Sequence, residues 1–178
     1  MTPSDINYNY LMLYTWRTLY PIAREAVLRP FGLSAGDMTI VAGADEMTVR
    51  RWANAPTALV QPRRGLLGAL RANKRPLILA YIAQGRSPLS NPLLAPMPQA
   101  ANTQLLFLWH RALGDPQLAQ YYELDKEDRL ALAQATASML ERWSQLPVAL
   151  AIPKKGLLPA LRKNDPRHLL PFFHDIPT

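Results

Sequence analysis

One pattern of residues occurs twice in this chain, and it constrains the fold more than any other feature. Residues 33–73 align without a gap on residues 124–164, with 17 identities in 41 positions. Ordinary composition would give only about 3 identities over that length. Both copies contain Pro, two basic residues, Gly, Leu-Leu and then Ala-Leu-Arg-x-Asn, as in "PRRGLLGALRAN" and "PKKGLLPALRKN". Such a pattern is typical of a tandem duplication, so two similar structural units are predicted.

Both units are predicted to be helical, because apolar residues recur at helical spacing between capping residues and prolines. In the first unit, helices are predicted over 7–20, 21–32, 36–43, 46–54, 63–73 and 76–85. Ser34 and Asp37 are predicted to cap the helix over 36–43, and Asp45 the helix over 46–54. In the second unit, Asp125 and Asp128 form a cap, and the helix that follows is predicted to continue unbroken to Trp143. A further helix over 154–164 is predicted to be kinked or shortened by Pro159. No segment shows the convincing alternation of a strand.

The predicted fold class is therefore all-α, with two tandem helical subdomains that each contain a helix-turn-helix and are related by the internal repeat. The first unit is predicted to span 1–86 and the second 102–178. Between them, residues 87–101 carry prolines at 88, 92, 96 and 98, a composition that favours an extended connector.

The overall charge favours a polyanionic partner. The chain of 178 residues has a net charge of +7 and a pI of about 10.0. Residues 1–91 hold eleven Lys and Arg against five acids, a net of +6, whereas residues 92–178 hold nine against eight, a net of +1. The first unit should therefore supply most of the attraction to a nucleic acid.

Other features of the composition exclude several classes of protein. The absence of Cys excludes disulfides, thiolate metal sites and cysteine nucleophiles. The N-terminus lacks the basic region of a signal peptide, and no apolar run is long enough for a membrane span, so a cytoplasmic protein without membrane contact is expected. The histidines at 110, 168 and 174 have no partner at metal-ligand spacing. We expect no metal, no cofactor, no catalytic residue and no enzymatic activity, since no catalytic motif is present.

One stretch of the first copy resembles a known DNA-binding motif. Residues 37–52, "DMTIVAGADEMTVRRW", comprise a short predicted helix, a turn and a second helix. They resemble the helix-turn-helix of bacterial transcription regulators of the lambda-repressor-like (XRE-like) group, whose second segment often reads G-V-S-x-x-T-V-x-R-W. Gly43 matches the turn glycine and Asp45 the cap, whereas Thr39 stands where the family has alanine. The matching residues on the second helix are Thr48, Val49, Arg51 and Trp52.

The resemblance implies that helix 45–54 lies in the major groove of double-stranded DNA. Glu46, Met47 and Arg50 lie on its free face, so they are the candidates for base readout, through bonds such as Arg to guanine or Glu to cytosine. The alternative is that Glu46 and Arg50 form an ordinary surface pair one helical turn apart. Val49 and Trp52 are predicted to point inward.

Phosphate contacts are predicted for Thr48 and for the two basic pairs. Cations in the first turn of a helix oppose its dipole, and a bound phosphate would compensate for that. Proline at position 62 is predicted to begin a helix, which places the first pair in such a turn. The alternative is that the basic side chains are solvated and cover apolar surface with their stems. The candidates are Arg63, Arg64, Lys154 and Lys155.

Residues kept in both copies are expected to serve the shared fold. Ion pairs are therefore predicted between Asp37 and Arg51, and between Asp128 and Arg142. The second copy lacks the turn glycine and the cap, and it has Glu141 where the first has Arg50. It is predicted to be an assembly or partner-binding unit, with a pseudo-two-fold DNA clamp as an open alternative.

The sequence as a whole favours a DNA-binding transcription regulator that also forms a homodimer or binds another regulatory protein. The alternative from a different class is a protein-interaction adaptor or anti-activator that keeps the fold and does not bind DNA. Steep loss of affinity with salt would favour the first class, and partner binding that persists at high salt would favour the second.

Overall fold

The computed structural model describes residues 3–19, 21, 28–85 and 96–172, and these are mostly helical, as an all-α class requires. Residues 22–27 of the helix predicted over 21–32 lie outside the described residues, as do residues 87–95 of the predicted connector. The rest of that connector is not extended, because a helix begins at Pro96 and includes residues 96–101. Proline suits the first turn of a helix, where its missing N–H has no role.

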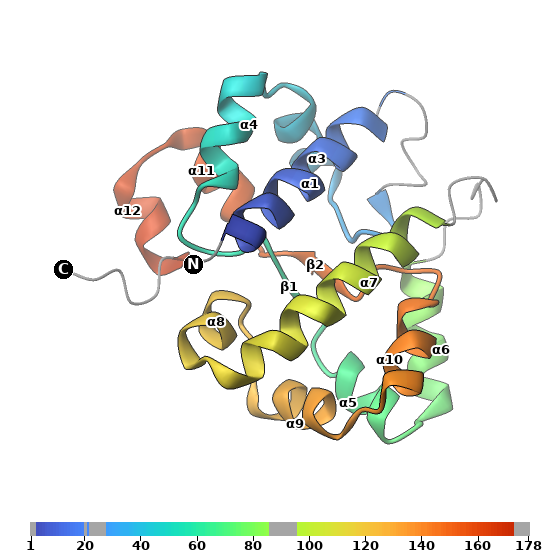
Figure 1. Ribbon diagram of the computed structural model, residues 1–178. Coiled ribbons are helices and arrows are strands. Elements are labelled where there is room, and N and C mark those ends of the chain that lie inside the picture. Colours follow the sequence, from blue (N-terminus) through green and yellow to red (C-terminus); the bar gives the residue numbers. More distant parts are fainter. Residues whose placement is uncertain (1–2, 20, 22–27, 86–95, 173–178) are drawn as a thin grey trace.

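The helices form two lobes, and each lobe contains helices from both halves of the chain (Figure 1). In the first lobe, α1 packs against α3 and α4, and α11 packs against α3. Its elements are α1 (Pro3–Leu19), α3 (Ala35–Ala42), α4 (Glu46–Ala53), α11 (Leu157–Lys163), α12 (Pro166–Leu169) and the 3₁₀ turn η3 (Leu170–Phe172).

The second lobe is built in the same way from the other helices. In it, α7 packs against α9 and α10, and α5 packs against α9. Its elements are α7 (Pro96–Arg111), η2 (Ala112–Gly114), α8 (Pro116–Tyr121), α9 (Lys126–Gln134), α10 (Ala137–Ser144), α5 (Leu66–Arg71) and α6 (Arg75–Gly85). Each helix that follows a basic pair thus lies with helices of the other half of the chain: α5 packs on α9, and α11 packs on α3. We refer to this arrangement as the exchange of α5 and α11.

Two short strands cross between the lobes, and the sequence did not predict them. Strand β1 (Val60–Pro62) pairs antiparallel with β2 (Ala151–Pro153), with Gln61 opposite Ile152. The ladder is extended at both ends, because Arg63 donates its N–H to the Leu150 carbonyl and Lys154 donates its N–H to the Leu59 carbonyl, both at 2.9 Å. The strands are too short for alternation to be visible in the sequence.

The predicted helix caps are confirmed. Ser34 and Asp37 form a reciprocal capping box at the start of α3, and Asp125 and Asp128 do the same at α9. The side chain of Asp45 accepts the Thr48 N–H at the start of α4. These bonds satisfy backbone donors that would otherwise have no partner in the first turn.

The prediction of one continuous helix up to Trp143 is wrong. Helix α9 ends at Gln134, Ala135 is extended, and α10 begins after Thr136. Thr136 accepts the Met139 N–H with its hydroxyl, at 3.2 Å. A hydroxyl cap therefore begins α10, as a carboxylate cap begins α4, and α9 and α10 are separate helices.

The basic pairs do not lie in the first turn of a helix, contrary to prediction. Gly65 and Gly156 precede α5 and α11 with φ values of 80° and 82°, a backbone conformation that glycine adopts without steric penalty. The basic pairs lie just before these glycines, directly after the strands. Pro159 does not shorten its helix, because α11 has 7 residues and α5 has 6. Proline is tolerated there because it lies within the first turn.

One cluster of buried apolar side chains includes residues of both lobes. Its largest fully buried members include Trp16 from α1 and Trp109 from α7. The two units predicted over 1–86 and 102–178 are therefore not packed separately. They share this apolar cluster, and one strand of the β1–β2 pair comes from each of them.

Candidate functional site

Helix α4 presents one face to the core and the other to solvent, as the sequence predicted. Val49 and Trp52 are buried against α1 and the rest of the core. On the outer face, Met47 is 81% exposed and the Arg50 side chain is 70% exposed. A buried face of this kind fixes the helix, while the outer side chains remain available to a partner.

Glu46 is not a free acceptor, because three side chains already bind its carboxylate. Its Oε1 accepts the Tyr10 hydroxyl at 2.8 Å and Arg50 Nε at 3.3 Å, and its Oε2 accepts Arg17 Nη2 at 2.9 Å. The bond from Tyr10, followed by that from Arg17, lowers the pKa of Glu46. The surface pair between Glu46 and Arg50 that was the alternative to base readout is therefore formed. Glu46 links α4 to α1 through this network.

A cleft of about 490 Å³ opens beside α4, where α3, α4 and α11 meet. Arg51 and Thr48 line it from α4, and Arg162 lines it from α11. Trp52 also borders this cleft, and its indole N–H has no hydrogen-bond partner among the described residues. Asp45 lies at the same cleft, and the bonds from Thr48, with a smaller contribution from Arg51, lower its pKa. Two cations from different helices, Arg51 and Arg162, therefore line one depression.

Arg63 does not face solvent, so its predicted phosphate contact is wrong. The residue is 7% exposed. Its Nε donates to the Ala149 carbonyl at 2.7 Å, and its Nη2 donates to the Pro30 carbonyl at 3.0 Å. Burial lowers the pKa of Arg63. The Arg63 side chain therefore has a structural role, because it connects Pro30 of the first half of the chain to Ala149 of the second half.

Lys154, which directly follows β2, is also buried and has a structural role. Its predicted phosphate contact is therefore also wrong. It is 3% exposed, and its ammonium donates to the Thr57 hydroxyl at 2.5 Å and to the Tyr121 carbonyl at 3.1 Å. Burial lowers its pKa to about 8. Pro30 and Tyr121, which accept from the two buried cations, are themselves 91 residues apart.

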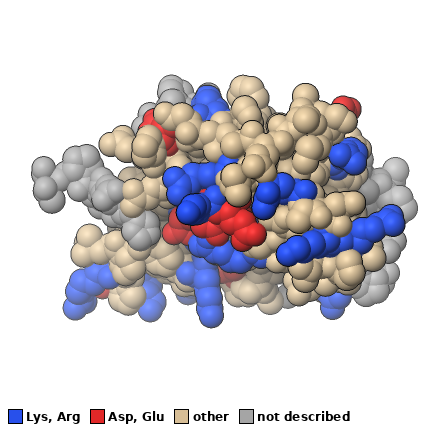
Figure 2. Space-filling model, turned by 90° about the horizontal axis from the view of Figure 1, so that it is seen from below, with Lys and Arg blue, Asp and Glu red and all other residues tan. Residues whose placement is uncertain are grey.

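Arg64 and Lys155, the second residues of the basic pairs, are exposed. Arg64 forms ion pairs with Glu123 at 3.9 Å and with Asp125 at 3.5 Å, so it lies at α9 in the second lobe and not beside α4. The face on the side of α8 and α9 shows acidic side chains clustered among basic ones, with no continuous basic patch (Figure 2). Lys155, just before α11, belongs to the lobe of α4.

The two predicted ion pairs do not form within the described residues. Asp37 instead accepts the Ser34 N–H in the capping box, at 3.5 Å. Asp128 is 1% exposed and accepts the Asp125 N–H at 3.2 Å. The arginines at 51 and 142 are both exposed. Asp37 and Asp128 therefore keep a shared structural role, but the role is capping.

Asp128 should make stability depend on pH. Burial raises its pKa to about 7, from an ordinary value of 3.8. Between these values the native state holds a proton that the unfolded state releases, so the free energy of unfolding should fall as pH rises from about 4 to 7. Asp128→Asn has no such proton, and relative to it the wild type should lose on the order of 2 kcal/mol between pH 5 and pH 8. Urea unfolding of both proteins at the two pH values tests this, and parallel pH profiles would contradict it.

Two buried asparagines, which the sequence did not predict, connect the long helices α1 and α7 to the chain before each strand. Asn9 Nδ2 donates to the Thr57 carbonyl at 3.1 Å, and its Oδ1 accepts the Leu59 N–H at 3.1 Å. Asn102 does the same with the Val148 carbonyl at 2.8 Å and the Leu150 N–H at 2.7 Å. A shared spacing, Asn-x₃-Leu-x₂-Trp, was available in the sequence at 9–16 and 102–109. The two occurrences of this spacing are 93 residues apart. The repeat over 33–73 and 124–164 has an offset of 91 residues, so an alignment without gaps does not include them.

No group of three or more potential metal ligands occurs within the described residues, and none of their helices is long and apolar enough to cross a membrane. Searches of protein-family models, curated proteins and solved structures gave no match to this chain.

Proposed function

We propose that this chain is a sequence-specific transcription regulator that binds double-stranded DNA with α4 in the major groove. The observation that carries the proposal is the outer face of α4, where Met47 and Arg50 are exposed beside the cleft that holds Arg51 and Arg162. An exposed Arg on a helix can bond guanine through two hydrogen bonds, and flanking cations can bind the phosphates.

In this proposal α3 and α4 act as a helix-turn-helix, with α3 supporting the reading helix. The phosphate contacts come from Arg51 and Arg162, with the exposed Lys155 nearby in the chain before α11. Thr48 lines the same cleft, so we propose that it binds phosphate as well. Arg50 and Met47 read base edges, whereas Glu46 positions Arg50 and Arg17 by binding both of them.

We further propose that the chain is a tandem duplicate whose second copy lost the reading function. Elements 91 residues apart have matching bounds: α4 and α10 span 46–53 and 137–144, and β1 and β2 span 60–62 and 151–153. On α10, the counterpart of Arg50 is the exposed Glu141, which would repel phosphate. The second lobe then serves assembly with another copy or a regulatory protein.

The test begins with selection of bound duplexes from a random DNA library, followed by affinity measurements over about 50 to 200 mM salt. A DNA reader should enrich one sequence and lose affinity steeply with salt. If no duplex is enriched and binding is negligible at low salt, the proposal is wrong. A protein partner retained at high salt would then favour the adaptor class.

Variants on α4 should separate base readout from phosphate binding. Arg50→Ala should reduce affinity for the selected sequence by about 5- to 100-fold while leaving binding to unrelated DNA nearly unchanged. Arg51→Ala/Arg162→Ala should weaken binding to all duplexes and reduce the slope of log affinity against log salt by about 2. The matched control is Arg142→Ala, because this arginine is the exposed counterpart of Arg51 on α10. An equal effect of the control would contradict the placement of the site.

A further inference from the structure

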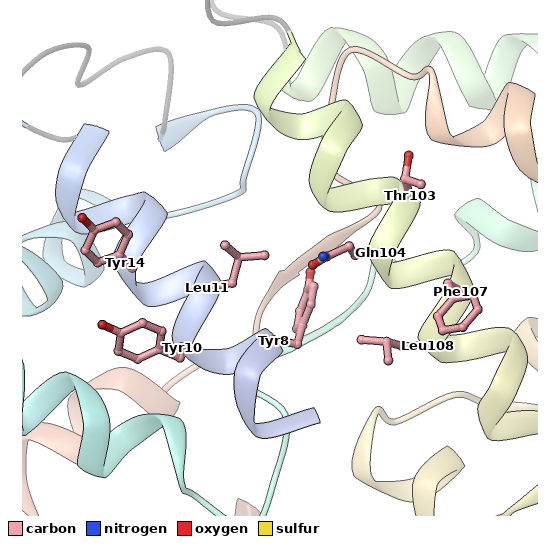
Figure 3. A pocket seen from close by; sticks show the side chains of 8 residues that line it. All are labelled: Tyr8, Tyr10, Leu11, Tyr14, Thr103, Gln104, Phe107 and Leu108. Carbon is pink, nitrogen blue, oxygen red and sulfur yellow. The ribbon is translucent and has the colours of Figure 1, made fainter. Parts of the chain in front are cut away.

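A second depression, distinct from the cleft beside α4, lies between the long helices α1 and α7. It has a volume of about 660 Å³, within the range of small-molecule sites. Tyr8, Tyr10 and Tyr14 line it from α1, and Phe107 lines it from α7, as Figure 3 shows. We refer to it as the α1–α7 cavity. Phe107 is 68% exposed and Tyr14 is 47% exposed, so large apolar surface remains open to solvent at this cavity.

The lining of the α1–α7 cavity is specific in its chemistry. Its described lining residues are aromatic, aliphatic, amide or hydroxyl side chains, and none is charged. Tyr8 is 2% exposed, and its hydroxyl has no hydrogen-bond partner among the described residues. In Figure 3 the Tyr8 ring extends from α1 toward Gln104 of α7. A buried hydroxyl without an acceptor is unfavourable, and an acceptor on a bound molecule would remove that penalty.

We propose that the α1–α7 cavity binds an uncharged aromatic small molecule that carries a hydrogen-bond acceptor for the Tyr8 hydroxyl. Rings of the ligand would stack on the tyrosines and Phe107, since aromatic pairs are favoured beyond their buried area. Burial raises the pKa of Tyr8 well above its ordinary value, so the hydroxyl stays a donor at neutral pH. A charged ligand is disfavoured, because no lining residue among those described would compensate for its loss of hydration.

Residues that line the α1–α7 cavity also contact residues that bind Glu46 of α4, so we propose that the cavity is coupled to α4. Tyr10, which lines the cavity, donates its hydroxyl to Glu46 at 2.8 Å, and Glu46 binds Arg50 on the outer face of α4. Arg17, which also binds Glu46, lies 5.9 Å from the centre of the Tyr14 ring. A ligand that moves either tyrosine would therefore change the position of Arg50. This part of the inference rests on the proposed DNA-binding function, whereas the binding of the ligand does not.

The binding test uses Prodan, an uncharged naphthalene ketone whose emission shifts to the blue in apolar surroundings. With the full-length protein and no DNA, we expect saturable binding at one site per chain and a blue-shifted emission. Thr103→Trp should fill the cavity from α7 and weaken binding at least tenfold. Leu79→Trp is the matched control, because Leu79 is 63% exposed on α6 and is not a lining residue.

The role of Tyr8 has its own variant. Tyr8→Phe removes only the hydroxyl, so we expect the fold to be retained and the affinity for Prodan to fall about 3- to 10-fold. Affinity for an analogue without the ketone should be unchanged. Absence of saturable binding to the wild type, or binding that Thr103→Trp does not weaken, would overturn the cavity assignment. An equal effect of Tyr8→Phe on both probes would overturn the role of the hydroxyl.

The coupling is tested separately with the selected duplex. Prodan should change the DNA affinity of the wild type at least threefold, and the change should be smaller in Tyr10→Phe, which lacks the hydroxyl bond to Glu46. If Prodan binds but DNA does not bind at all, the proposed function fails and the ligand site stands. If both bind with no mutual effect in the wild type, the coupling is wrong.

Discussion

Residues 1–91 and 92–178, expressed as separate fragments, are not expected to fold as monomers, but they should fold together when they are mixed. Each fragment alone lacks a helix that covers its own lobe: α3 loses α11, and α9 loses α5. Strands β1 and β2 pair with each other, so neither has a partner within its own fragment among the described residues. Circular dichroism should show little cooperative unfolding for either fragment as a monomer. The equimolar mixture should regain helix content and elute as one complex.

The cut between residues 91 and 92 falls between α6 and α7, so it removes no described element. The control is the intact chain refolded under the same conditions. A fragment that unfolds cooperatively as a monomer would contradict the exchange of α5 and α11, because it would show that one half can close its own core. A folded homodimer of one fragment would agree with the exchange, since a second copy then supplies the missing helix.

Asn9→Leu is expected to cause a large loss of stability, although the two side chains have similar volumes. It would leave the Thr57 carbonyl and the Leu59 N–H buried without their side-chain partner. Each such group costs about 1 to 3 kcal/mol, so the free energy of unfolding should fall by about 3 to 5 kcal/mol. For a chain of this size the melting temperature should fall by about 10 °C. Denaturant unfolding and thermal unfolding measure the two effects.

Asn102→Leu should cause a loss of similar size, because Asn102 binds the equivalent groups at Val148 and Leu150. The control is Asn54→Leu at the exposed end of α4, where, among the described residues, the side chain binds the Arg50 carbonyl alone. That substitution should cost less than about 1 kcal/mol. If Asn9→Leu lowered the free energy of unfolding no more than Asn54→Leu, the hydrogen bonds of the buried Asn9 amide would not contribute to stability as expected.

Local signals predicted much of the fold. The caps at Ser34, Asp45 and Asp125 are bonds within one turn, so residue types three positions apart are enough to predict them. The inward face of α4 follows in the same way from the spacing of Val49 and Trp52. Exposure of Met47 and Arg50, the basis of the candidate site, was therefore predictable.

The exchange of helices between the halves was not predictable from the same signals. Leu66, Leu67 and Leu70 of α5 recur in α11, so the two helices offer nearly the same apolar face. Sequence alone does not tell which of them covers α3 and which covers α9. The choice depends on β1 and β2 crossing between the lobes, and a three-residue strand leaves almost no pattern.

The error at Arg63 and Lys154 has a related cause. Arg and Lys are almost never fully buried unless they are paired, so an exposed position was the natural prediction. Here the partners are carbonyl groups and a hydroxyl that the exchange brings together, such as Ala149 and Pro30 around Arg63. The adjacent Arg64 is exposed, so one basic pair contains a structural cation and a surface cation.

The packing of α11 on α3 also has a consequence for synthesis. A ribosome makes α3 roughly 120 residues before α11, and at about 5 to 20 residues per second that delay lasts several seconds or more. During this time the apolar residues of α3, such as Met38 and Val41, lack the helix that later packs beside them. The nascent first half is therefore a natural client for chaperones, and slowing of translation between the two halves should lower the yield of soluble protein.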